Sequence, residues 1–172
     1  MTTDAPRPYP DLDTLPERAM LEAMLDWYRD GVLAKVAGVA QATAVATPLG
    51  SATSIAGLVK HLALVDWSWF GEDIAGEAPL DWYAAADWDA DRDWEFHTAT
   101  TEPIELQVQR YRDACDRSKA VAARFELDDL GTNTTRRPFT LRFVYLHMIE
   151  ETARHLGHLD ILRELLDGST GE

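Results

Sequence analysis

Hydrophobic residues recur at helical spacing in four long stretches of the chain. These stretches are Pro16–Val39, Ile55–Ala75, Pro103–Phe125 and Leu141–Leu166. In each of them apolar side chains return every three or four residues, which places them on one face of an α-helix. No two segments show the alternating pattern of paired strands. The pattern therefore predicts an all-α protein, a four-helix bundle with long connecting loops.

Turn-forming residues mark the ends of two of these helices. Thr53 or Ser54 is the expected N-cap of the second helix, and Gly76 is expected to end it. Gly168 is the expected stop of the fourth helix.

Two segments lack a helical period. Residues 79–100 place tryptophans among aspartates with no period of 2 or 3.6, which predicts a long ordered loop anchored by its aromatic rings. Residues 1–14 form a leader rich in proline and aspartate. With 172 residues, the whole chain is expected to be a single domain, 1–172.

Composition excludes several classes of partner. The formal net charge of −14 argues against binding to nucleic acid or to an anionic membrane, because both are polyanions. The second helix carries Lys60, His61 and Asp66 near its centre, so a membrane span is not expected. Cys115 is the single cysteine, which excludes an intramolecular disulfide and a cysteine-rich zinc site. Cys115 is expected to be a passive helix residue, and the N-terminus has no signal peptide, so a cytoplasmic location is expected.

The fourth helix concentrates the candidate chemistry. At about 100° per residue, His147, Glu151, His155 and His158 fall within roughly a quarter of its circumference. Each polar group that is buried needs a partner, because an unpaired one costs about 1–3 kcal/mol. A divalent metal would serve several of these groups at once. His61, on the second helix, would complete an open three-ligand site of the catalytic kind.

A plainer interpretation of the same residues is a helix-surface Glu–His contact together with a hydrogen-bonded histidine at the edge of the core. If a metal binds, spacing alone does not decide between the pair Glu151/His155 and the pair His147/Glu151. His97 lies in the expected loop and is assigned no function. Most tryptophans are expected to anchor the core and the loops, and one or two would line a pocket beside the metal: Trp67, Trp69, Trp82, Trp88 and Trp94.

Two segments carry a resemblance to a known family. SATSIAGLVKHLALVDWSWF and LHMIEETARHLGHLDILRELLDG resemble the DinB-like/YfiT-like superfamily, in its mycothiol-dependent maleylpyruvate isomerase and thiol S-transferase branch. LDWYRDGVL is a weaker match. The resemblance implies an up-down-down-up bundle, often dimeric, with a divalent metal held by His61, Glu151 and His155. His147 and His158 would then surround the site without binding the ion.

The resemblance also implies an activity. A metal, with zinc expected and nickel or manganese as alternatives, would activate a low-molecular-weight thiol, mycothiol, for transfer to a small electrophile. The related isomerases carry a second C-terminal domain, and this sequence stops at Glu172; that favours a stand-alone S-transferase. Three alternatives are kept: a metal-binding bundle without turnover, a metal-hydroxide hydrolase, and a dimerising protein whose His–Glu row is an interface.

Overall fold

The structure, a computed structural model, describes residues 8–133 and 137–170. Within these ranges it is all-helical and contains no strand, only an isolated bridge between Leu130 and Thr140. None of the described helices is long and apolar enough to cross a membrane. The helical elements are, in chain order, α1 (Glu17–Val36), α2 (Gln41–Ala44), α3 (Ile55–Trp67), the π-helix η1 (Ser68–Ile74), α4 (Trp94–Ala99), α5 (Ile104–Ala122) and α6 (Leu141–Asp167).

The four long helices predicted from the hydrophobic pattern are confirmed as α1, α3 with its continuation η1, α5 and α6. Ser54 caps α3, because its side-chain oxygen accepts a hydrogen bond from the backbone N–H of Gly57 at 3.0 Å. Gly168 ends α6 in a left-handed conformation, with φ of 75°, which glycine adopts without steric cost.

The prediction of an unbroken loop over residues 79–100 is wrong at its C-terminal end, where α4 forms. A helix of six residues makes fewer than two turns, so it is too short to show a hydrophobic period. The leader falls partly outside the described residues, which begin at residue 8. Residues 8–14 contain no helix, and the backbone oxygen of Pro8 accepts a hydrogen bond from the Trp27 indole on α1 at 3.1 Å.

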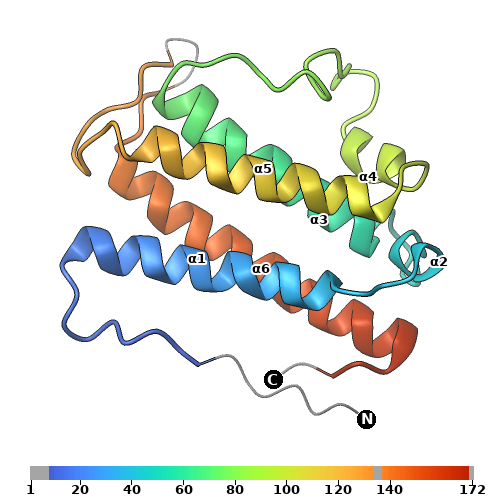
Figure 1. Ribbon diagram of the computed structural model, residues 1–172. Helices are drawn as coiled ribbons and strands as arrows, with labels where there is room; N and C mark the ends of the chain where they lie inside the picture. The colour runs from blue at the N-terminus through green and yellow to red at the C-terminus, as the bar shows by residue number, and fades with distance from the viewer. Residues whose placement is uncertain (1–7, 134–136, 171–172) are drawn as a thin grey trace.

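The long helices associate in two pairs, α1 with α6 and α3 with α5 (Figure 1). The pairs meet mainly where α3 and η1 contact α6. Apolar side chains from all four helices are buried between them, including Leu25, Val32, Leu58, Leu62, Tyr111, Met148, Leu159 and Leu162. This burial, at about 25 cal/mol per Å² of apolar surface, is the main force that holds the helices together.

The short helix α4 packs directly on α3. Gly57 permits this contact, because a Cβ atom at that position would lie 2.5 Å from Cδ1 of Phe96. Phe96 in turn lies against the His61 ring, with 5.5 Å between ring centroids. Because α4 packs on α3 in this way, residues of α4 lie next to His61.

Candidate metal centre

Three side chains from α3 and α6 converge on one point. Nε2 of His61 lies 3.2 Å from Oε1 of Glu151, and Nε2 of His155 lies 3.0 Å from the same oxygen. One ligand atom from each residue can be chosen so that all lie within 4.8 Å of one another. Glu151 and His155 are one helical turn apart on α6, and the packing of α3 on α6 supplies His61. We call these three residues the His–Glu cluster.

The remaining histidines occupy other positions. The His147 ring packs on Trp69 with 4.3 Å between ring centroids. His158 is exposed, and its Nδ1 lies 3.2 Å from Nδ1 of His155. His97 is exposed, pairs with Asp91 at 2.8 Å and does not belong to the cluster. The residues that converge with His61 are therefore Glu151 and His155, and not His147. Helical spacing alone did not distinguish the pair Glu151/His155 from the pair His147/Glu151.

Sequence reasoning missed one residue of the site, Glu95 on α4. Its Oε1 lies 2.9 Å from Nδ1 of His61, and the residue is only 7% exposed. Its other oxygen, Oε2, is buried without a hydrogen-bond partner among the described residues. No spacing rule links Glu95 to His61, since they are 34 positions apart and Glu95 lies in a segment without a period.

Electrostatics favour positive charge at the His–Glu cluster. Burial lowers the pKa of His61, but hydrogen bonds with Glu151 and Glu95 outweigh it and raise that pKa to about 9. Hydrogen bonds with His155 and then with His61 lower the pKa of Glu151 well below its usual range. Burial, followed by the nearby His155, lowers the pKa of His158.

His61 has a carboxylate oxygen facing each of its ring nitrogens. A neutral imidazole carries only one N–H, so it can donate to only one of them. The second contact is satisfied either by an added proton or by a cation bound at Nε2. With Glu95 accepting from Nδ1, the nitrogen left for a cation is Nε2, which faces Glu151 and His155.

The donor set fits a divalent transition metal. Imidazole nitrogen and carboxylate oxygen are ligands of zinc, nickel and manganese. Bonds of about 2.0–2.2 Å in a tetrahedral arrangement place ligand atoms about 3.3–3.6 Å apart, close to the 3.0 and 3.2 Å separations at Glu151. Three protein ligands leave a coordination position for a substrate, which is the pattern of catalytic sites.

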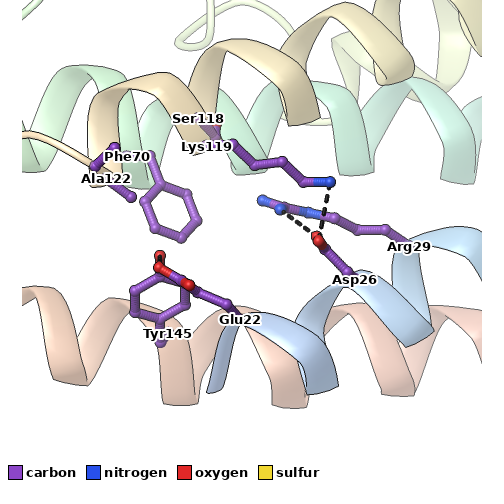
Figure 2. Close-up of a pocket in the computed structure, with 9 residues that line it drawn as sticks. Glu22, Asp26, Arg29, Phe70, Ser118, Lys119, Ala122 and Tyr145 are labelled. Carbon is purple, nitrogen blue, oxygen red and sulfur yellow. Dashed lines mark hydrogen bonds and ion pairs between the residues drawn. The ribbon is translucent and has the colours of Figure 1, made fainter. Parts of the chain in front are cut away.

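A second polar cluster lies on the other side of α3, and it borders a cavity of about 250 Å³. Arg29 on α1 contacts both carboxylate oxygens of Asp66 on α3: its Nε donates to Oδ2 at 2.9 Å, and its Nη2 donates to Oδ1 at 2.9 Å and to Oδ2 at 2.7 Å. Asp26 pairs with both Arg29 and Lys119 at the cavity (Figure 2). The cavity lining includes no residue of the His–Glu cluster. Each charge named here has an opposite charge beside it, so this second cluster offers no set of free ligands.

Comparison with known proteins identifies the family. Residues 20–168 match the sequence model of the mycothiol-S-transferase family. The match covers most of the chain, so the chain belongs to this family, a member of the DinB-like branch. No curated protein matches the chain. The family indicates a transferase activity that involves mycothiol, and it confirms the resemblance inferred from the sequence.

Proposed function

We propose that this member of the mycothiol-S-transferase family transfers mycothiol, through its sulfur, onto a small electrophile and that it depends on a divalent metal. The family supports the thiol and the reaction class. The observation that carries the metal dependence is the convergence of His61, Glu151 and His155, with ligand atoms within 4.8 Å of one another. Zinc is the expected ion, and nickel or manganese suits the same ligands.

A divalent ion held by His61, Glu151 and His155 would lower the pKa of the mycothiol thiol, so that the thiolate would be present at neutral pH. The chain supplies the geometry. Glu95 accepts a hydrogen bond from the Nδ1–H of His61 and so leaves Nε2 facing the site. His158 can do the same for His155, whose Nδ1 lies 3.2 Å from the Nδ1 of His158. The buried Cys115 takes no part, because burial raises the pKa of its thiol and it lies beside Asp66, outside the His–Glu cluster.

The architecture proposed with this function is the up-down-down-up bundle of the DinB-like branch, formed as a single domain by α1, α3, α5 and α6. The association of α1 with α6 and of α3 with α5 supports it. A homodimer and a cytoplasmic location stay predictions from the sequence.

Elemental analysis of the purified protein tests the metal dependence. We expect about one divalent ion per chain in the wild type and none in His155→Ala. His97→Ala is the matched control, because His97 is an exposed histidine paired with Asp91 outside the cluster. Circular dichroism establishes that both variants keep their helices. Absence of metal from the wild type, even after incubation with zinc, nickel and manganese salts, would overturn the proposal.

Mass spectrometry tests the reaction. The metal-loaded protein, mycothiol and a panel of electrophiles should yield the S-conjugate faster than the uncatalysed mixture does. His155→Ala should lose this acceleration, and His97→Ala should keep it. A protein that binds metal yet accelerates no conjugation would instead be a metal-binding bundle without turnover. Ester hydrolysis in the absence of thiol would favour the hydrolase alternative.

A further inference from the structure

Four aromatic side chains form a continuous strip beside the His–Glu cluster. They are Trp69 of η1, Phe139 before α6, and Phe143 and His147 of α6, and we call them the aromatic strip. The Phe139 and Phe143 rings stack with 4.9 Å between centroids and 15° between planes. The Phe143 and His147 rings are parallel within 2°, at 6.0 Å. The centroid of the Trp69 ring system lies 4.3–6.1 Å from the centroids of the other three rings.

The aromatic strip leads to the cluster. His147 precedes Glu151 by one turn of α6, about 6 Å along the helix axis. Trp69 follows His61 by about two helical turns, about 12 Å, and its ring packs on His147 where η1 contacts α6. An electrophile with its reacting carbon at the cluster could therefore contact the strip if it contained one or two aromatic rings.

The aromatic strip is not closed off from solvent. Phe143 is 43% exposed, and Trp69, Phe139 and His147 are half-buried. Because these rings are stacked on one another, the strip offers solvent mainly a row of apolar ring edges. Aromatic rings prefer edge-to-face or offset-stacked contact with other rings. An aliphatic group would gain burial there but none of the ring–ring preference.

We propose that the aromatic strip binds the planar, conjugated part of the electrophile, so that aromatic electrophiles are the preferred substrates. This proposal rests on the proposed thiol transfer. In the step we consider, the thiolate sulfur attacks the ring carbon that bears a halogen. The S–C bond forms, the C–Cl bond breaks, chloride leaves with the bonding electron pair, and the thiol proton passes to solvent.

The test compares two chlorides with the metal-loaded protein and saturating mycothiol. 1-Chloro-2,4-dinitrobenzene is aromatic, and chloroacetamide is small and aliphatic. In Phe143→Ala the ratio of kcat/KM for the aromatic chloride to that for the aliphatic one should fall about 2- to 10-fold, the range for one aromatic pair. Leu146→Ala is the matched control, because Leu146 is 54% exposed on α6 and is not part of the aromatic strip. An unchanged ratio in Phe143→Ala, or an equal fall in Leu146→Ala, would overturn the proposal.

A binding measurement separates this proposal from the proposed function. 1,3-Dinitrobenzene has no leaving group, so its dissociation constant can be measured by calorimetry whether or not the protein catalyses transfer. Weaker binding in Phe143→Ala than in Leu146→Ala supports the aromatic strip even if transfer fails. Equal binding in both variants overturns it. If Phe143→Ala instead converts a dimer to a monomer in sedimentation experiments, with unchanged binding of the probe, the strip is an interface between two copies of the chain.

Discussion

The His–Glu cluster and the polar cluster of Arg29 and Asp66 each contain one residue of α3. These residues, His61 and Asp66, are five positions apart and therefore lie on different faces of that helix. In the Arg29–Asp66 cluster the planar guanidinium donates three hydrogen bonds that engage both oxygens of the carboxylate, and neither side chain is more than 5% exposed. In the His–Glu cluster one oxygen of Glu151 is shared by two imidazoles. In the first cluster both partners are satisfied by each other, whereas in the second one potential ligand atom from each of three residues lies within 4.8 Å of the others.

The difference separates a structural use of charge from a binding use. A buried pair with matched geometry ties helices together, and its removal leaves an uncompensated charge. A convergent set of nitrogen and oxygen donors is stabilised further by a cation. Removal of one charged side chain should therefore destabilise the protein at the Arg29–Asp66 pair. At the His–Glu cluster, stability should depend instead on whether a metal ion is added or removed.

The largest effect is expected from Asp66→Ala. Removal of this carboxylate leaves the buried Arg29 with only its 3.3 Å contact to the partly exposed Asp26. The free energy of unfolding should therefore fall by about 3–5 kcal/mol in urea denaturation. Asp26→Ala is the matched control. Asp26 also contacts Arg29 but its side chain is 39% exposed, so its loss should cost under about 1 kcal/mol. Equal losses in the two variants would contradict the structural role of the Arg29–Asp66 pair.

Metal binding should stabilise the folded chain by a smaller amount. Zinc at 100 times its dissociation constant should add about 2.7 kcal/mol to the free energy of unfolding. For a domain of this size, that corresponds to a rise in Tm of about 5–10 °C by differential scanning calorimetry. The rise should disappear in His155→Ala and persist in Asp26→Ala. A similar rise in His155→Ala would show that zinc binds somewhere else.

Glu95→Gln should weaken metal binding without abolishing it. Residues that accept a hydrogen bond from a metal-binding histidine typically contribute about 10- to 100-fold to affinity, and we expect a loss in that range by competition with a chelator. Asp91→Asn is the control, since Asp91 makes the same kind of contact with His97 at the surface. If Glu95→Gln binds the ion as tightly as the wild type, Glu95 does not orient His61.

The smallest effect is expected at Cys115. Burial, followed by the charge of Asp66, raises the pKa of its thiol well above the usual range, so the native protein should react slowly with a thiol reagent at pH 8 and rapidly once unfolded. Cys115→Ala should leave the metal content and thiol transfer unchanged and cost about 1 kcal/mol of stability. Rapid reaction of the native thiol would show that the Arg29–Asp66 cluster opens readily.

The helices could be predicted from the sequence because each is long enough to repeat its apolar face several times. The convergence of Glu151 and His155 followed from one turn of a single helix. Spacing alone did not select this pair over His147 and Glu151, and the family resemblance supplied the choice. His147 lies against Trp69 instead, a contact between two helices that no local pattern contains.

Contacts between elements account for the rest of what the sequence could not predict. Glu95 reaches His61 from a helix too short to show a period. Arg29 and Asp66 each lie in a predicted helix, but their pairing depends on the angle at which α1 and α3 pack. The π-helix at Ser68–Ile74 alters the helical turn where Trp69 begins the aromatic strip.

Gly57 lies one turn before His61 on α3 and belongs to neither the His–Glu cluster nor the aromatic strip. A methyl group at this position would meet the Phe96 ring at 2.5 Å and its Cα at 3.3 Å, and the backbone of α4 cannot yield as a flexible side chain does. Glu95 is the residue before Phe96, so it would move with that backbone. A methyl group at Gly57 is therefore expected to change the affinity of the proposed site for a metal, although it lies one helical turn from His61.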